Sequence, residues 1–383
     1  MSTAVVKSAD ELLEEIELLL PTVEDKVLRA IAEKVLSGRR LTPEDALYLF
    51  NTDELTLLGL LAEYRNRLIN DRYAYFVVNV QINPTNVCIY GCKFCAFAVK
   101  GRKHPRAYEM TIEEILEKIG RIYELGGREV HMVGGIPPHW RYEDYLNLLR
   151  TIKRHYPDVV LKAYTAIEVY HLTKLSKKSV RDVLLELKEA GLDVLPGGGA
   201  EIFNEEKRKI IAPYKASAQQ YLEIHREAHR LGIPTNITML YGHIEDFADR
   251  VEHMTKVREV QDETGGFQVF IPLKYHPEGT ELGGELTSSV DDLKTHAIAR
   301  LFLNNFKHIK AYWVTLGERV AQMALNYGAD DIDGTILEER IVHAAGTKAA
   351  LGHAKERLIK LIKDAGKIPA QRDTFYRIKK VYQ

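Results

Sequence analysis

All three cysteines of this 383-residue chain fall within eight positions, as Cys88, Cys92 and Cys95. An odd number of thiols excludes a complete disulfide framework, and their clustering indicates a metal site. Structural zinc takes four Cys or His ligands, and this segment holds a single C-x2-C pair, so zinc would need a distant histidine. A [4Fe–4S] cluster takes four thiolates, so three cysteines leave one iron open. The C-x3-C-x2-C spacing therefore favours a cluster whose open iron binds substrate.

The elements that must position these thiols are predicted from short apolar runs that alternate with amphipathic stretches. The eight predicted strands cover residues 73–82, 128–135, 159–166, 192–199, 235–242, 267–274, 307–314 and, as the weakest, 329–335. Between them lie helical patterns such as 111–125, where Thr111 and Glu114 form a capping box. Eight such units predict a parallel sheet, either closed as a (β/α)8 barrel or open and doubly wound. We favour the α/β barrel of the TIM type because glycine and polar residues follow nearly every predicted strand.

Both flanks of the predicted barrel (71–335) have helical patterns. Residues 1–70 are predicted to form an N-terminal helical segment, in which Thr42 caps a helix that begins with Pro43. Residues 336–383 are predicted to form a helical C-terminal extension packed on the barrel.

The composition excludes several classes of protein. Lys and Arg total 53 and Asp and Glu total 54, a net charge of −1 that argues against a nucleic-acid partner. No apolar run approaches the ~20 residues that cross a bilayer, so we expect no membrane partner. The first twenty residues are acidic and lack a basic segment before an apolar one, which predicts no secretory signal and a cytoplasmic location.

Glycines and polar side chains near the ends of predicted strands are candidates for binding a cofactor: Gly134, Gly135, Thr165, Glu168, Gly198 and Glu201. Glycine lets a backbone approach a ligand closely, although Gly-Gly before Pro-Pro is also a common turn. Glu168 is suited to accept hydrogen bonds from ribose hydroxyls, and a helix N-terminal role favoured by the macrodipole is the alternative. The acidic cluster Asp330, Asp331 and Asp333 is expected to cap a helix or to orient a donor in the site.

A C-x3-C-x2-C motif after the first strand of a barrel resembles the radical S-adenosylmethionine superfamily. The resemblance implies that the thiolates hold a [4Fe–4S] cluster and that S-adenosylmethionine chelates the open iron. Electron transfer from an external donor, such as flavodoxin or ferredoxin, then breaks the C5′–S bond and gives a 5′-deoxyadenosyl radical. It also implies that Phe94 packs near the adenine, with loop packing as the alternative. The Gly134-Gly135 backbone would meet the methionine amino group, although Ile136 replaces the family's usual acidic residue.

Segments spread over residues 70–350 resemble the aminofutalosine synthases. They are NPTNVCIYGCKFCAF (83–97), KAYTAIEVYHL (162–172), LPGGGAEIFNEE (195–206), TNITMLYGHIE (235–245), QDETGGFQVFIPLKYHPEGTEL (261–282), LNNFKHIKAYWVTLG (303–317) and GADDIDGTILEERIVHAAG (328–346). The sister enzymes that cyclise dehypoxanthine futalosine share much of this pattern. Thr165-Ala166, Phe203 and Leu273 favour the synthases. Residues 134–137 and 212–215 depart from the synthase pattern.

This resemblance implies addition of the adenosyl radical to 3-[(1-carboxyvinyl)oxy]benzoate, an aryl enol ether, in menaquinone biosynthesis. The products are 6-amino-6-deoxyfutalosine, methionine and bicarbonate, and S-adenosylmethionine is consumed as a co-substrate. Such a site binds two carboxylates and excludes water. The candidate carboxylate partners are His243, Lys274, His276 and Arg319. A structural role is the alternative for each histidine.

Three other interpretations stay open. The first is cyclic dehypoxanthine futalosine synthase or another radical enzyme that abstracts hydrogen. The second is a non-catalytic iron–sulfur or zinc sensor, which would need neither an open iron nor a chemically equipped barrel mouth. The third is an ordinary barrel enzyme with a vestigial cysteine loop.

Overall fold

Parallel strands close into a barrel in the computed structural model, which describes residues 7–383. The strands are β1 (Tyr73–Val77), β2 (Asn79–Ile82), β3 (Glu129–Met132), β4 (Val160–Ala163), β5 (Thr235–Tyr241), β6 (Phe267–Lys274), β7 (His308–Ile309) and β8 (Asp331–Gly334). Single bridges complete the ring, from Lys162 to Val194, from Leu195 to Thr235 and from Lys310 to Asp331. β8 pairs with β1, so the prediction of a closed (β/α)8 barrel is confirmed.

Several predicted strands differ from the pattern in length. The segment 192–199 contributes only two bridging residues, because Pro196 lacks an N–H and the chain then turns through Gly197 against β5. The segment 307–314 contains the two-residue β7 and then enters the helix α13 (Trp313–Leu316). The Trp313 indole donates to the Gly334 carbonyl at 3.1 Å, which fixes this helix against β8.

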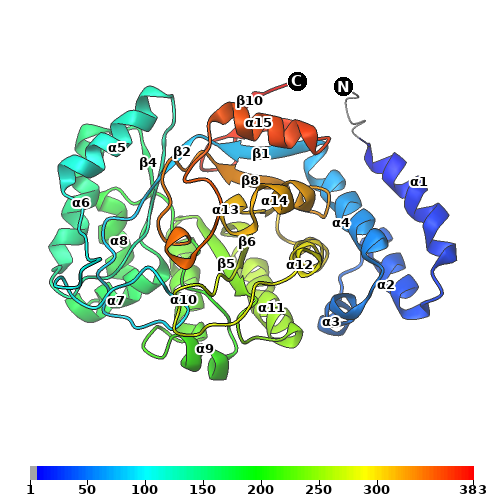
Figure 1. The fold of residues 1–383 in the computed structure, drawn as a ribbon, viewed down its shortest axis with the longest axis horizontal. Helices are drawn as coiled ribbons and strands as arrows, with labels where there is room; N and C mark the ends of the chain where they lie inside the picture. The colour runs from blue at the N-terminus through cyan, green and yellow to red at the C-terminus, as the bar shows by residue number, and fades with distance from the viewer. Residues whose placement is uncertain (1–6) are drawn as a thin grey trace.

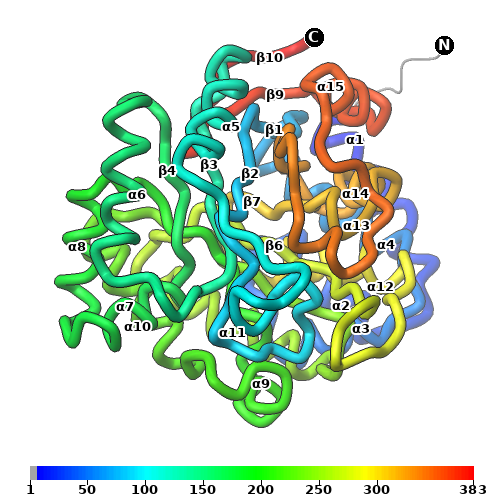
Figure 2. The backbone as a smooth tube through the Cα atoms, turned by 60° about the vertical axis from the view of Figure 1, so that its left-hand side comes forward, coloured from blue at the N-terminus to red at the C-terminus, as the bar shows by residue number. Residues whose placement is uncertain are grey.

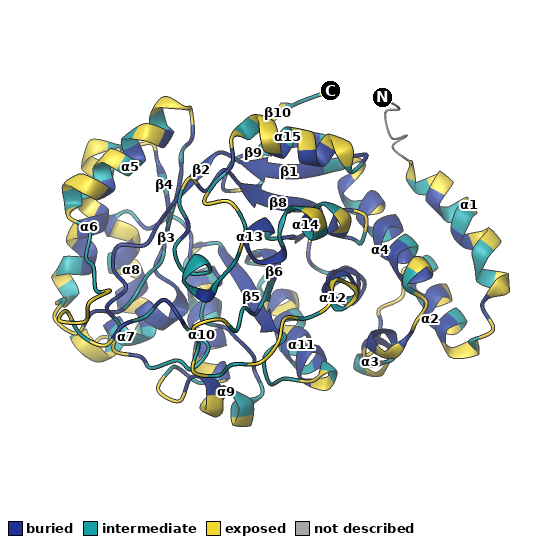
Figure 3. Ribbon diagram, in the orientation of Figure 1, coloured by how far each residue is buried: buried dark blue, intermediate teal, exposed yellow. Residues whose placement is uncertain are grey.

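Helices surround the barrel, with their inner faces buried and their outer faces exposed (Figure 3). They are α5 (Ile112–Glu124), α6 (Tyr142–His155), α7 (Ala166–Ser176), α8 (Val180–Ala190), α9 (Glu205–Ile211), α10 (Ala218–Arg230), α11 (Phe247–Thr264), α12 (Ser289–Phe302) and α14 (Glu318–Ala324). The capping box of Thr111 and Glu114 is present at α5, as predicted. No helix among residues 7–383 is long and apolar enough to span a membrane.

The N-terminal helices lie together on one side of the barrel, beside α11 and α12 (Figure 1). They are α1 (Ala9–Leu19), α2 (Lys26–Leu36), α3 (Pro43–Asn51) and α4 (Leu55–Asn70). Thr42 caps α3, and Pro43 occupies its first position, as the sequence predicts. The first six residues of the predicted segment 1–70 lie outside the described residues.

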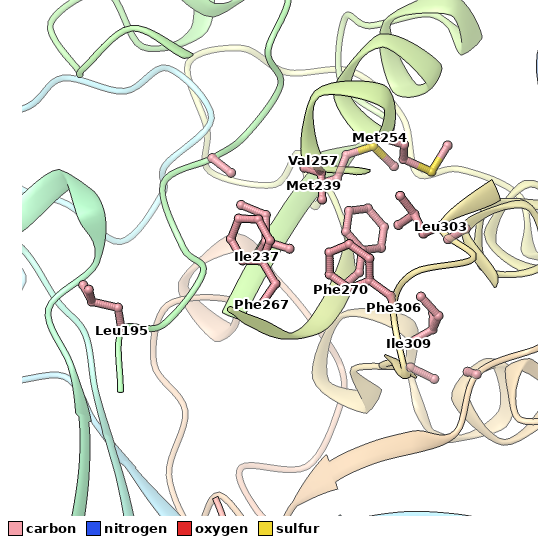
Figure 4. Close-up of a cluster of buried hydrophobic side chains, with 14 of the residues drawn as sticks. Leu195, Ile237, Met239, Met254, Val257, Phe267, Phe270, Leu303, Phe306 and Ile309 are labelled. Atoms are coloured by element: carbon pink, nitrogen blue, oxygen red, sulfur yellow. The ribbon is translucent and has the colours of Figure 1, made fainter. Parts of the chain in front are cut away.

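In strands β5 and β6, the side chains alternate between the hydrophobic core outside the barrel and the cavity inside it. Ile237 and Met239 of β5 pack outward with Phe270 of β6 in a buried hydrophobic cluster under α11 and α12 (Figure 4). Asn236 and Thr238 alternate with them and face the interior of the barrel. Successive side chains of a strand point to opposite faces, so one short segment supplies both packing and polar groups.

The C-terminal extension corrects the prediction of an all-helical segment. It contains α15 (Lys355–Asp364) and then a hairpin of β9 (Ile368–Arg372) and β10 (Ile378–Val381). β9 pairs in parallel with β1, where the first strand of the barrel breaks at Val78 and only β2 continues to β3 (Figure 2). The strand pattern was missed because β10 is a mostly exposed, lysine-containing edge with no apolar face.

Candidate functional site

A cavity of about 300 Å³ lies at the carboxyl ends of the barrel strands. The predicted site residues that line it are Cys88, Cys92, Cys95, Phe94, Gly134, Gly135, Thr165, Glu168, Gly198, Glu201, Lys274 and His276. Residues from widely separated parts of the chain thus meet at the end of the barrel where this fold places its active sites. Neither His243 nor Arg319 lines the cavity.

The cysteine loop follows β2 and is fixed by backbone hydrogen bonds. The Cys88 amide donates to Val99 at 3.1 Å, and the Ile89 amide donates to Ile136 at 2.9 Å. Burial raises the pKa of all three thiols. Within residues 7–383, no three Cys, His, Asp or Glu side chains converge on a site for a single metal ion. Three thiols on one clamped loop, all facing one cavity, fit a polynuclear cluster, which binds thiolates on separate irons.

Gly134 and Gly135 are required by the packing of the cysteine loop. A Cβ at Gly135 would lie 2.4 Å from the Val87 carbonyl oxygen, and one at Gly134 would lie 2.9 Å from that of Thr85. The Gly135 amide donates to the same Thr85 carbonyl at 2.7 Å. The close approach that the sequence predicted is therefore made to the protein backbone, and it sets the position of the thiols.

Lys215 also lines the cavity, although the sequence indicated it only as part of the segment 212–215, which departs from the synthase pattern. Its ammonium donates to Glu201 at 2.7 Å and lies 5.0 Å from the centre of the Phe94 ring. Burial raises the pKa of the Cys92 thiol, and the nearby Lys215 charge opposes that rise. No sequence motif includes Lys215, because α9 and a turn lie between it and Glu201, its partner near the end of the fourth predicted strand.

Thr165 and Glu168 form the capping box of α7, the alternative that the sequence left open. The Thr165 amide donates to the Glu168 carboxylate at 3.0 Å, and the Thr165 hydroxyl donates to the same oxygen. Both residues are buried against the cavity wall, and burial raises the pKa of Glu168 to about 6. The carboxylate thus both orders α7 and faces the cavity.

The predicted carboxylate partners differ in how far protein groups already satisfy them. Lys274 donates to Asp292 at 2.7 Å and to the Thr287 carbonyl at 2.8 Å. His276 contacts the Thr315 carbonyl through Nε2 at 2.8 Å, and burial lowers its pKa. The Lys274 ammonium and the His276 ring both lie at the cavity, and each also contacts oxygen atoms of the protein.

His243 and Arg319 lie outside the lining of the cavity. The His243 side chain is fully buried, with Nε2 3.1 Å from the Leu240 carbonyl and Nδ1 accepting from the Ile244 amide at 2.7 Å. Both ring nitrogens are therefore occupied by local backbone groups. Arg319 is exposed on α14. A basic residue after a predicted strand indicates a position near the mouth of the barrel. It does not indicate which way the side chain points.

The acidic cluster of Asp330, Asp331 and Asp333, which begins just before β8 and continues into it, is not a helix cap. Asp330 pairs with Arg300 at 2.6 Å and with His308 at 2.5 Å. Asp333 accepts from Lys310 at 3.0 Å and lines the cavity. The three carboxylates therefore neutralise buried cations, because an unpaired charge at this depth is costly.

The chain matches the radical SAM superfamily over residues 82–257 and the CofH/MqnC C-terminal region over residues 264–383. It is 46% identical to aminodeoxyfutalosine synthase of Thermus thermophilus, with 94% of this chain and 98% of that protein covered. It is 40% identical to cyclic dehypoxanthine futalosine synthase of Streptomyces coelicolor, with 91% and 88% covered.

The fold is also similar to that of a solved structure. The crystal structure of methylornithine synthase superposes with a TM-score of 0.72 at 19% identity, with 89% of this chain and 97% of that chain covered. The shared fold agrees with the sequence match, and the three cysteines line the cavity of the barrel. The chain therefore belongs to the radical SAM superfamily, in the group of enzymes that contains the aminodeoxyfutalosine synthases, and its cofactors are a [4Fe–4S] cluster and S-adenosylmethionine.

Proposed function

We propose that the protein is an aminodeoxyfutalosine synthase. It would join S-adenosylmethionine to 3-[(1-carboxyvinyl)oxy]benzoate and release 6-amino-6-deoxyfutalosine, methionine and bicarbonate for menaquinone biosynthesis. The observation that carries this proposal is the 46% identity to such a synthase across nearly the whole length of both chains. Thr165 and Leu273, two positions that favour the synthases over the cyclising sister, both line the cavity.

The three thiolates would hold the cluster, which supplies the electron that cleaves the C5′–S bond of S-adenosylmethionine. The carbon radical must then add to the vinyl carbon before it takes hydrogen from elsewhere. The cavity wall contains apolar side chains such as Leu240, Ile271 and Leu273, which exclude water. No cysteine exists outside the cluster motif, so the chain offers no other thiol as a hydrogen donor.

The group that would orient the co-substrate is the Lys215–Glu201 pair with Phe94. These residues come from three separate segments and meet at the cavity. The apolar face of Phe94 suits adenine stacking, and the buried Glu201 carboxylate suits a hydrogen-bond donor of the ligand. The sequence-based roles of Thr165, Glu168 and Gly198 in nucleotide binding are part of the same proposal.

We also propose that the external electron donor is a small acidic carrier such as flavodoxin or ferredoxin. Exposed basic residues follow the cysteine loop directly: Lys100, Arg102, Lys103 and Arg106. Arg106 also donates to the Ala96 carbonyl at 3.3 Å, which ties this basic segment to the thiol loop. Opposite charges steer such encounters and bring the carrier to the part of the surface nearest the thiols.

The deciding experiment is anaerobic mass spectrometry of the reconstituted, reduced protein with both substrates. A product that contains the adenosyl and aryl parts, together with free methionine, supports the synthase. Free 5′-deoxyadenosine without an adduct would move the function to the cyclising sister or another hydrogen-abstracting enzyme. Absence of any cleavage with an intact cluster would support a sensor instead.

A further inference from the structure

A tier of polar side chains lies inside the barrel, further from the strand ends than the cysteine loop. Gln81 of β2 is directly opposite His131 of β3, and His131 is directly opposite Lys162 of β4. Asn236 of β5 and Lys310 after β7 line the same cavity. Apolar branched residues usually fill the interior layers of this fold, so a polar tier is not needed to close the barrel. We call these five residues the polar tier.

The polar tier carries more hydrogen-bond donors than the protein satisfies. Lys162 donates to Glu129 at 2.6 Å, and Lys310 donates to Asp333 at 3.0 Å. Each ammonium has three protons, yet each has only this one acceptor within hydrogen-bond distance in the described part of the chain. Both side chains are at most 4% exposed, so bulk water does not supply the remaining acceptors. Protons that face a cavity in this way are available to an acceptor on a ligand.

Most carboxylates near the lysines of the polar tier lie on the side away from the cavity. Glu129 and Asp331 are fully buried and do not line the cavity, and Arg372 from β9 lies between them, 2.5 Å from Asp331 and 3.8 Å from Glu129. Of the carboxylates near the two lysines of the polar tier, Asp333 lines the cavity, and it accepts a hydrogen bond from Lys310. Burial and the two ammoniums lower the pKa of His131 to about 3, so its imidazole is neutral.

We propose that the polar tier is the subsite for the ring carboxylate of an aromatic acid, with Lys162 as its direct partner. This inference rests on the proposed function and assigns one of the two carboxylates of that substrate. A carboxylate accepts several charge-assisted hydrogen bonds, which matches the free donors of Lys162, Lys310 and the Gln81 amide. The apolar side chains of Ile271 and Leu273 lie on the cavity wall between this tier and the mouth, where an aryl ring would pack.

The first test uses the holoenzyme and a matched pair of probes, 3-hydroxybenzoate and its neutral carboxamide. Isothermal titration should give roughly 100-fold tighter binding of the carboxylate, the effect of leaving a buried charged donor unpaired. Equal affinity for the two probes would overturn the inference. The comparison needs no variant, so it does not depend on whether a variant folds.

The second test removes the subsite without leaving a buried charge. The double variant Lys162→Met, Glu129→Gln should bind the two probes with affinities within a few-fold of each other, while KM for S-adenosylmethionine stays unchanged. The matched control Lys367→Met, Glu63→Gln removes a buried lysine and its carboxylate that do not line the cavity, and it should keep the roughly 100-fold preference. A thermal midpoint for each variant identifies loss of fold.

Three outcomes of these tests distinguish a failure of this inference from a failure of the proposed function. If the wild type forms the adduct yet the Lys162 double variant keeps the carboxylate preference, the subsite is wrong and the function stands. If KM rises for S-adenosylmethionine and not for the aryl acid, the tier binds the methionine carboxylate and the inference is overturned. Preferential binding of 3-hydroxybenzoate by a protein that forms no adduct would support the subsite and contradict the synthase proposal.

Discussion

Lys215 and Glu201 form a buried ion pair, 2.7 Å between Nζ and Oε1, that joins the segment after α9 to the glycine-rich turn after the fourth strand position. Because the Lys215 charge also opposes the raised pKa of Cys92, this pair couples the cavity wall to the thiol loop. The site is thus held by an electrostatic contact that no motif describes.

Replacement of Lys215 by Met should weaken cluster retention. The Cys92 thiolate would lose a favourable neighbouring charge, and a lost interaction of about 1.4 kcal/mol corresponds to about tenfold in cluster affinity. We expect iron loss to a chelator under anaerobic conditions to accelerate by about that factor. Lys93→Met is the matched control, since Lys93 is on the same loop but half-exposed, 3.7 Å from an exposed Glu281. Equal rates in the two variants would contradict the coupling.

Gly135→Ala should displace the cysteine loop. The new Cβ would lie 2.4 Å from the Val87 carbonyl, and a backbone atom cannot rotate away. We expect about 1–3 kcal/mol of destabilisation and a lower iron content after reconstitution. Gly91→Ala is the control, because its Cβ would meet only the flexible end of Lys100, at 3.5 Å. Full iron loading of Gly135→Ala would show that the loop tolerates the shift.

Arg372→Met should destabilise the fold strongly. Arg372 is 1% exposed and pairs closely with Asp331 beneath the cavity, so its loss leaves this buried carboxylate without its closest cation at a cost of about 3–5 kcal/mol. Arg377→Met removes an exposed arginine of the same hairpin, paired with Asp373, and should cost less than about 1 kcal/mol. Denaturant unfolding of both variants tests this difference. A similar loss in both would mean that hairpin packing, and not the buried charge, carries the stability.

Glu168 should make stability fall between about pH 4.5 and pH 6. Burial raises its pKa from 4.5 to about 6, so the folded protein holds this proton more tightly than the unfolded chain. The resulting stabilisation is complete below pH 4.5 and is lost as the pH rises through 6, about 2 kcal/mol in total. The wild-type minus Glu168→Gln difference in unfolding free energy, measured across this range, should show that decline. A flat difference would indicate that Glu168 is ionised throughout.

Charge reversal beside the cysteine loop should slow reduction by an acidic carrier. The double variant Lys100→Glu, Lys103→Glu places repulsive charge on the exposed basic segment, and we expect about a tenfold slower reduction of the cluster by flavodoxin at low salt. Wild-type rates should fall with ionic strength towards those of the variant. Lys379→Glu, Lys380→Glu in the exposed β10 is the control. If it slows reduction equally, the donor binds elsewhere.

The sequence supported the barrel because its strands and helices obey local rules. The capping box of Thr111 and Glu114 predicted the start of α5, and polar residues at the ends of predicted strands indicated where the cavity lies. Directions of single side chains were not predictable: His243 turns into its own backbone, although Lys274 and His276 reach the cavity. A strand position fixes which face a residue occupies, but a residue beyond the strand end can rotate freely.

The interior polar groups were missed for a different reason. Lys162 and His131 alternate with apolar residues in strands, a pattern that is equally typical of a solvated strand face. Only closure of the barrel shows that this polar face is interior. Arg372 was not predicted to be buried because Asp331 and Glu129, the carboxylates near it, are distant in sequence. The hairpin that contains Arg372 was also not predicted, because its edge strand β10 contains lysines and is mostly exposed.

The position of β9 has a consequence for biosynthesis of the chain. β9 follows all eight barrel strands in the chain, and its Arg372 supplies a cation close to Asp331 and near Glu129. Domains otherwise begin to fold from the N-terminus during synthesis. Here a nascent barrel without β9 holds Asp331 without its closest cation and leaves β1 without one of its neighbours, so a chain terminated before residue 368 would present quality-control proteases with an incompletely stabilised barrel.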